Sequence, residues 1–217
     1  MVRPSLVVFD LDGTLADSQE GVLHSFALTL AEDGRRESVT NLRNLIGPPL
    51  SESFERLGYD DEAIDDAVVR YRVHYDRDGV DMSRLYDGAM AMLDGLRALG
   101  IELRVATSKR VDFARRMLRN LAVDSYFSVV CGAALDGTLN TKREVLDEAL
   151  RFAPSHSPIR SWMVGDRRED MRAALDLAVV PVGALWGYGS PDELRESGAL
   201  LAMPSCSAVL EHLHATK

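Results

Sequence analysis

An acidic segment near the start of the chain is the first feature that could carry chemistry. Residues 10–14 read D-L-D-G-T and directly follow a short apolar run at residues 6–9. Two carboxylates held this close together repel each other unless a cation neutralises them. The glycine lets the backbone approach a ligand closely. The segment therefore indicates a cation-binding site.

Two other interpretations of this segment must be weighed. An EF-hand calcium loop that began at Asp10 would need glycine at position 15 and glutamate at position 21, where the sequence has Leu15 and Gly21. The calcium loop is therefore disfavoured. An acidic turn that merely follows a strand stays open on this motif alone.

A second acidic segment supports the cation site. Residues 165–170 read G-D-R-R-E-D and follow the apolar run 162–164. Alone, this pattern also suits a helix N-terminus with favourably placed acids. If the strands before the two segments are neighbours, Asp10, Asp12 and Asp166 converge on one point. A cluster that offers only oxygen ligands suits Mg²⁺.

Residues that could hold an anion accompany these acids. Thr107 and Ser108 end the apolar run 101–106, and Lys142 lies just inside an expected helix. Hydroxyl groups, backbone N–H groups and an ammonium group could hold phosphate oxygens beside the cation. Taken singly, the two hydroxyl residues also suit a cap on the next helix, and a lysine suits a solvated helix face.

The elements that must position these residues alternate along the chain. Short apolar runs are separated by segments with apolar residues at helical spacing, which is typical of a parallel sheet covered by helices on both faces. The sequence therefore predicts a doubly wound α/β fold. The expected strands lie at residues 6–9, 101–106, 126–130, 162–164 and 179–182.

The alternation stops after the first strand. Residues 17–83 show helical spacing and no strand run, with helices expected at 50–57 and 63–75. Asp17 and Glu20 resemble a capping box that opens an earlier helix. We expect a helical domain at 17–83, inserted into an α/β domain formed by residues 1–16 and 84–217.

Composition narrows the protein class. The net charge of −9 disfavours a nucleic-acid polymer as partner. No apolar stretch approaches the roughly 18 to 20 residues that span a bilayer, and the N-terminus lacks a signal-peptide pattern. Two cysteines give no disulfide framework. We expect a soluble, cytoplasmic protein without a membrane partner.

Taken together, these motifs resemble those of the haloacid dehalogenase (HAD) superfamily of hydrolases. The resemblance covers D-x-D-G-T at 10–14, T-S-K at 107–109, Lys142 before a helix, and G-D-x-x-x-D at 165–170. The helical insert occupies the place of that superfamily's α-helical cap. Segments 7–17, 106–109 and 126–137 look most like the phosphoglycolate phosphatase group.

The resemblance implies a role for each motif residue. Asp10 would attack phosphorus and form an aspartyl-phosphate, while Asp12 would serve as the general acid and base. Mg²⁺ would be held by the Asp10 carboxylate, the Asp12 backbone carbonyl and Asp166. The remaining roles concern the phosphate and its surroundings: Thr107, Ser108 and Lys142 would bind the phosphoryl oxygens, and Asp170 would orient Lys142 or metal-bound water.

The expected activity is a Mg²⁺-dependent phosphomonoesterase acting on a small phosphorylated metabolite, similar to phosphoglycolate phosphatase. A 5′-nucleotidase differs only in its leaving group and stays open, as does a phosphomutase of the β-phosphoglucomutase type. A dehalogenase would need neither Asp12 nor a metal. Outside enzymes, a phosphate-accepting or inactive binding module is the alternative, although Asp10, Asp12, Lys142 and Asp166 are all present. A monomer or homodimer is expected.

Overall fold

The structure is a computed structural model that describes residues 3–43, 45–134, 138–151 and 160–215. It divides into two compact units: a core unit of residues 1–17 and 85–217, and an insert unit of residues 18–84. These boundaries lie one residue from those expected from the sequence. Part of the expected segment 126–137, namely residues 135–137, lies outside the described residues.

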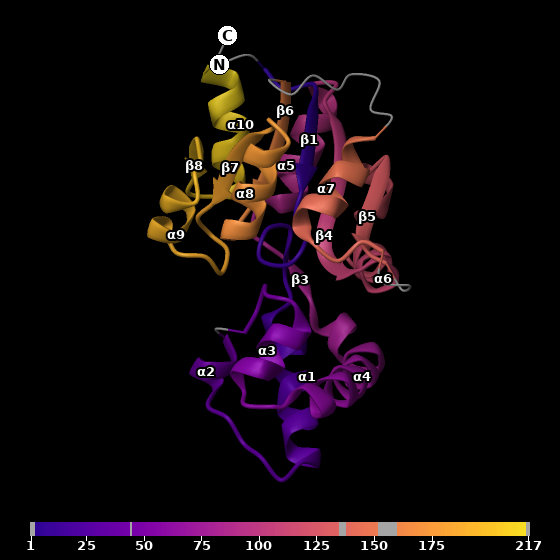
Figure 1. The fold of residues 1–217 in the computed structure, drawn as a ribbon. Coiled ribbons are helices and arrows are strands. Elements are labelled where there is room, and N and C mark those ends of the chain that lie inside the picture. Colours follow the sequence, from indigo (N-terminus) through magenta and orange to yellow (C-terminus); the bar gives the residue numbers. More distant parts are fainter. Residues whose placement is uncertain (1–2, 44, 135–137, 152–159, 216–217) are drawn as a thin grey trace. The chain divides into compact units, whose positions relative to one another are not determined.

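The core unit contains a six-stranded sheet in the order β5-β4-β1-β6-β7-β8 (Figure 1). Each neighbouring pair of strands is parallel. The bounds in chain order are β1 (Leu6–Phe9), β4 (Glu102–Arg110), β5 (Val129–Ala133), β6 (Ser161–Gly165), β7 (Val180–Ala184) and β8 (Leu201–Met203). The chain therefore builds outward from β1 in one direction and then returns to its other side, which confirms the expected α/β class.

Helices cover both faces of this sheet (Figure 1). Helices α7 (Lys142–Leu150) and α8 (Arg168–Asp176) pack together on one face, and α5 (Ala89–Ala98) and α10 (Cys206–Ala215) pack together on the other. The other elements are α6 (Val111–Asn120), η2 (Asp124–Tyr126) and α9 (Pro191–Glu196). The core is thus doubly wound.

Strand β1 is apolar on both of its faces, which explains why it lies at the centre of the sheet. Leu6 and Val8 join the buried cluster that also contains Leu146 of α7 and Met163 of β6. The intervening side chains of a strand point to the opposite face. The whole strand is inaccessible to solvent. Burying each large apolar side chain contributes about 1.5–3 kcal/mol, so β1 anchors both layers.

Two strand predictions were wrong by three or more residues at an end. Strand β5 begins at Val129 rather than 126, because Asp124–Tyr126 forms a 3₁₀ turn and Ser128 N–H donates to Leu103 O as pairing starts. Strand β4 continues to Arg110. Thr107 and Ser108 therefore lie inside the strand, not after it.

The chain leaves and re-enters the core unit through two short strands that the sequence did not reveal. These strands, β2 (Ala16–Asp17) and β3 (Arg84–Leu85), pair with each other. The capping box expected at Asp17 and Glu20 is not formed. Ser18 is the N-cap and makes no side-chain cap bond. Asp17 instead accepts a hydrogen bond from the Tyr188 hydroxyl.

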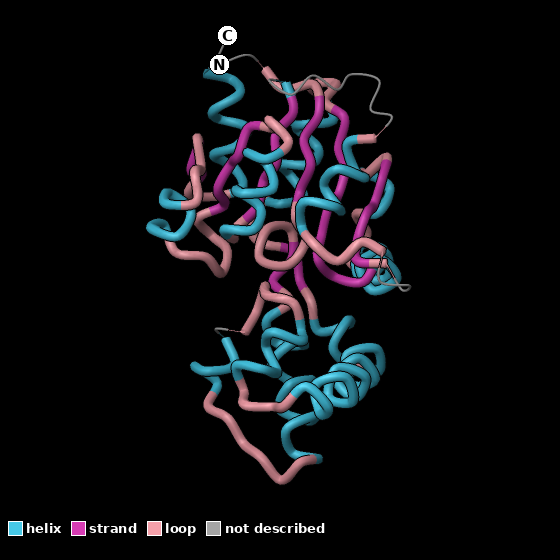
Figure 2. Tube along the Cα trace, viewed as in Figure 1, coloured by secondary structure: helices cyan, strands magenta, loops and turns pink. Residues whose placement is uncertain are grey.

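The insert unit consists of helices joined by loops (Figure 2). Its elements are α1 (Gln19–Glu32), α2 (Val39–Arg43), α3 (Leu50–Arg56), α4 (Asp61–Arg77) and η1 (Gly79–Met82). The short helix α2 was not predicted. Aromatic rings fill the core of this unit, where Phe26 contacts Phe54 and Tyr71 at centroid distances of 5.4 and 4.7 Å.

An ionic network lies on the surface of the insert unit. Arg70 of α4 contacts Glu32, Asp33 and Asp66, and Glu32 also pairs with His74. The hydrogen bonds from Arg70 lower the pKa of both Glu32 and Asp33.

Among the described residues, no helix is long and apolar enough to cross a membrane.

Candidate active site

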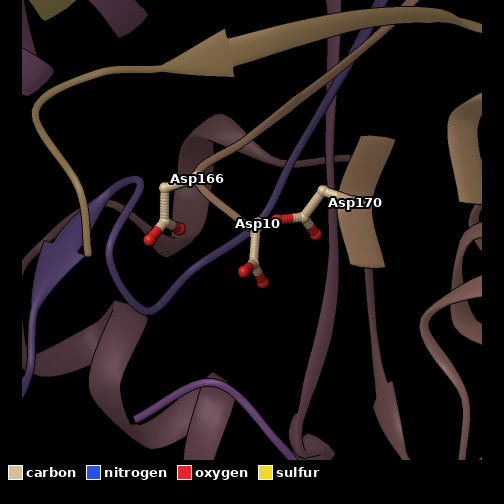
Figure 3. Close-up of side chains that lie close together, drawn as sticks. All are labelled: Asp10, Asp166 and Asp170. Carbon is tan, nitrogen blue, oxygen red and sulfur yellow. The ribbon is translucent and has the colours of Figure 1, made fainter. Parts of the chain in front are cut away.

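The register of β1 and β6 brings two of the predicted acids together. Phe9 pairs with Val164, and Asp10 N–H donates to Val164 O at 2.9 Å. Asp10 and Asp166 thus follow adjacent strand ends. Asp170 projects from the first turn of α8, toward Asp10 (Figure 3). One carboxylate oxygen of each residue lies within 4.8 Å of the others, so the three form an acidic cluster.

Burial makes this cluster electrostatically costly. Asp166 and Asp170 are inaccessible to solvent, and Asp10 is 6% exposed. The pKa of Asp10 is raised to about 6, mainly by burial; Lys142 opposes this rise, and the charge of Asp170 adds to it. Burial, with the charges of Asp10 and Asp170, also raises the pKa of Asp166 well above its ordinary value.

Lys142 is the cation within this cluster. Its Nζ lies 2.7 Å from Asp10 Oδ1 and 2.9 Å from Asp170 Oδ1, and it donates a hydrogen bond to Ala106 O at 3.2 Å. Burial by itself would lower the pKa of Lys142, but the two carboxylates raise it above its ordinary value. Lys142 is therefore a buried charged group and does not belong to a solvated helix face.

The cluster fits a divalent cation. Three buried carboxylates face one ammonium group, which leaves negative charge that a metal ion would neutralise. The donors are all oxygens, the ligands that Mg²⁺ prefers. A cation bound beside these carboxylates would oppose the raised pKa values of Asp10 and Asp166, because nearby positive charge favours the ionised form.

Both oxygens of Asp166 already have hydrogen-bond donors. The Thr14 hydroxyl donates to Oδ1 at 2.9 Å, and the Tyr188 N–H donates to Oδ2 at 2.8 Å. Gly13 has φ +81° and passes so close that a Cβ there would lie 2.3 Å from Asp166 Oδ2. The glycine of the first motif is thus required by both its backbone conformation and its packing.

The Asp12 side chain lies outside the acidic cluster and pairs with Lys109, whose Nζ is 3.0 Å from Asp12 Oδ2. Thr107 is buried, and its Oγ1 accepts from Lys109 N–H at 3.2 Å. Ser108 is half-buried. The cap interpretation of Thr107 and Ser108 is wrong, because Arg110 occupies the N-cap position of α6.

Sequence reasoning assigned no role to several residues that hold the site together. Thr14 and Lys109 were within the motifs, but their partners, Asp166 and Asp12, depend on the tertiary structure. Tyr188 lies in a segment, W-G-Y-G, whose paired glycines after an expected strand were the available signal.

Two arginines of the second motif also have specific partners. From the sequence alone, we expect Arg167 and Arg168 to be solvated, with one of them able to pair with Glu169 or a neighbouring acid. Instead, Arg167 Nε and Arg168 N–H both donate to Glu193 Oε1 at 3.0 Å. The partner comes from α9, 25 or 26 residues further along the chain, so sequence proximity could not identify it.

Comparison with known proteins places this site in a family. The family model described as haloacid dehalogenase-like hydrolase matches residues 7–183. The tyrosine-protein kinase PtkA of Mycobacterium tuberculosis is 40% identical over 191 residues. That match covers 87% of this chain but 65% of PtkA, so the chain spans less than two thirds of that relative's length.

Two further matches span most of both chains. A 5′-nucleotidase of Pseudomonas aeruginosa is 38% identical over 194 residues, which are 87% of this chain and 86% of the relative. The crystal structure of a predicted phosphatase from Clostridium acetobutylicum superimposes with a TM-score of 0.92 at 33% identity, covering 99% of this chain and 100% of that chain. The resemblance drawn from the motifs is confirmed, and the chain belongs to the haloacid dehalogenase-like hydrolase family.

Proposed function

We propose that this protein is a Mg²⁺-dependent phosphomonoesterase that hydrolyses a small phosphorylated metabolite, similar to phosphoglycolate phosphatase, through an aspartyl-phosphate on Asp10. One observation carries the proposal: Asp10, Asp166 and Asp170 form a buried cluster with Lys142 at the carboxyl edge of the sheet. Open α/β sheets bind their ligands at this edge.

The first step would transfer the phosphoryl group to the enzyme. An Asp10 carboxylate oxygen forms a bond to phosphorus as the ester P–O bond breaks, and Asp12 gives its proton to the leaving alkoxide. Lys142 lies against Asp10 and would balance negative charge on the phosphoryl oxygens, the main task in phosphoryl transfer. Thr107 and Ser108 would donate further hydrogen bonds.

The second step would release phosphate. Asp12, now a carboxylate, takes a proton from water while the water oxygen attacks phosphorus, which breaks the bond to Asp10 and restores its carboxylate. Asp10, Asp166 and the Asp12 backbone carbonyl would hold Mg²⁺. The metal supplies positive charge that reduces repulsion between the nucleophile and the phosphate. Asp170 would hold Lys142 in place.

The names of two relatives define the alternatives. The 5′-nucleotidase supports a nucleoside monophosphate as substrate, since this activity needs the same residues and a different leaving group. The mycobacterial kinase supports transfer to a protein tyrosine, in which a tyrosine hydroxyl would replace water as acceptor. Hydrolysis is preferred over transfer to tyrosine because water serves as the acceptor, so the reaction needs no second organic substrate.

Phosphate release from a panel of phosphomonoesters tests the proposal. The panel contains phosphoglycolate, nucleoside monophosphates, sugar phosphates and an aryl phosphate, each with Mg²⁺ and with EDTA. A parallel assay follows transfer of the ATP γ-phosphate to a tyrosine-containing protein. We expect Mg²⁺-dependent release that Asp10→Asn reduces by at least about 10³-fold, since it removes the nucleophile.

Asp176→Asn is the matched control, because Asp176 is exposed on α8 and should leave turnover unchanged. If every ester stays intact while the folded protein binds Mg²⁺, hydrolysis is the wrong assignment. Transfer to protein tyrosine without ester hydrolysis would favour the kinase alternative.

A further inference from the structure

The loop between β7 and α9, residues 185–190 with the sequence L-W-G-Y-G-S, contacts the surroundings of Asp166 repeatedly. The Tyr188 N–H donates to Asp166 Oδ2 at 2.8 Å. Trp186 Nε1 donates to Thr14 O at 2.9 Å, and the Thr14 hydroxyl donates to Asp166 Oδ1. The loop therefore reaches one carboxylate oxygen directly and the other through Thr14.

Two glycines allow this close packing. A Cβ on Gly187 would lie 2.3 Å from both Asp166 Cβ and Gly13 O. A Cβ on Gly189 would lie 1.9 Å from Asp166 O. Any side chain at either position would have to displace Asp166 or the D-x-D-G-T turn. The loop is thus built to lie directly against the acid.

Side chains anchor the loop on both sides of this contact. The Tyr188 hydroxyl donates to Asp17 Oδ1 at 3.3 Å, and Tyr188 also shares a side-chain hydrogen bond with Tyr86. On the other side, Glu193 of α9 accepts from Arg167 and Arg168, the two residues after Asp166. The loop and the acid are therefore tied to the same neighbouring segments.

We propose that the 185–190 loop positions Asp166 for the metal, so that Trp186, Gly187 and Tyr188 set the Mg²⁺ affinity without touching the ion. This inference rests on the proposed function. Its physical basis is that hydrogen-bond partners which fix the orientation of a ligand carboxylate change metal affinity by about 10- to 100-fold when they are lost. Trp186 and Tyr188 are thus positioning residues for the proposed reaction.

Direct titration of the metal-free protein with Mg²⁺ tests this role by isothermal calorimetry. Tyr188→Phe keeps the N–H bond to Asp166 but removes the hydroxyl that anchors the loop to Asp17. Trp186→Phe removes the bond to Thr14, and Gly187→Ala places a methyl group against Asp166. Each variant should raise the Mg²⁺ dissociation constant by about tenfold. In phosphate release, the Mg²⁺ concentration for half-maximal activity should rise equally, while turnover at saturating Mg²⁺ recovers. A residue that only supported folding would not produce this split.

Two controls match the chemistry of these variants. Tyr126→Phe removes a tyrosine hydroxyl that donates to Asp94 at 2.6 Å, and Gly183→Ala adds a methyl group that meets Leu194 and Ala199 side chains at 3.1–3.5 Å. Both should bind Mg²⁺ like the wild type. If Gly187→Ala does not fold, the two aromatic variants, which keep an aromatic ring at each position, decide the question.

The outcomes separate the two proposals. Unchanged Mg²⁺ affinity in the folded loop variants, beside a wild type that binds Mg²⁺ and releases phosphate, would overturn the role of the loop alone. A wild type that binds no Mg²⁺ in the calorimeter would overturn the metal-dependent function and this inference together.

Discussion

At the scale of single residues, Lys142 is the cation that lies within the acidic cluster. It is buried, and it lies between Asp10 and Asp170 at ion-pair distance from both. Three buried acids without this cation would leave uncompensated charge in a medium of low dielectric constant. The residue proposed to bind phosphate is thus also part of what lets the acidic cluster fold.

Lys142→Met should destabilise the metal-free protein by about 3 kcal/mol, since removing one partner leaves buried carboxylates unpaired. Urea unfolding in EDTA measures this loss. Arg143→Met, at the next position, should cost less than about 0.5 kcal/mol. Arg143 is more than half exposed, and its ion pair with Asp176 is long, at 4.0 Å. Lys142→Met with Asp170→Asn should regain part of the loss. If Lys142→Met were as stable as Arg143→Met, Lys142 would not compensate the charge of the acidic cluster.

At the scale of elements, the start of α7 determines where Lys142 lies. Thr141 is the N-cap, and its hydroxyl accepts from Glu144 N–H at 3.2 Å. Glu144 Oε2 accepts in return from the N–H groups of Thr141 and Asn140 at 2.9 and 3.0 Å. This capping box fixes the helix so that its first residue, Lys142, faces the strand ends.

Thr141→Ala should lower stability by about 1 kcal/mol, the usual effect of losing an N-cap side chain. It should also reduce phosphate release, because the first turn that carries Lys142 loosens. Asp60→Ala removes the equivalent cap of α4, where Asp60 accepts from Ala63 N–H, and should cost similar stability without changing turnover. Urea unfolding and phosphate release measure the two effects. Wild-type turnover in Thr141→Ala would mean that the cap does not position Lys142.

At the scale of the whole molecule, two groups of acids respond to pH in opposite ways. The pKa of Asp10 is raised from 3.8 to about 6 on folding, so its ionisation opposes folding as pH rises through this range. The pKa values of Glu32 and Asp33 in the insert unit are lowered, so their contribution to stability is lost as pH falls through the folded pKa.

The melting temperature in EDTA should therefore be highest near pH 4 and should fall as pH rises from about 4 to 6, the range between the unfolded and folded pKa values of Asp10. Saturating Mg²⁺ should remove this fall, because the ion binds the ionised carboxylates and stabilises the folded state by mass action. Thermal unfolding across pH 3–8, with EDTA and with Mg²⁺, measures both curves. Asp10→Asn should lack the Asp10 contribution to the fall. Parallel curves with and without Mg²⁺ in the wild type would contradict a metal site at the acidic cluster.

Local patterns in the sequence were enough to predict the fold class and the acids. The spacing of apolar residues within each strand or helix reflects which of its faces is buried, and this spacing is a local property of the sequence. The α/β class and the helical insert could therefore be predicted from the sequence. The D-x-D-G-T and G-D-x-x-x-D segments were recognisable because their residues are close in the chain. The positions where prediction failed, such as the start of β5 and the Asp17 cap, depend on pairing with distant partners.

Other features depend on contacts between residues far apart in the chain. Asp10 meets Asp166 because β6 returns to pair with β1, a choice that no local pattern encodes. Thr14 and Tyr188 hold Asp166 from 152 and 22 residues away. The raised pKa of Asp10 likewise follows from burial by the assembled core. The local sequence thus identifies the acids as candidate site residues, whereas strand order and burial determine their partners and their charge.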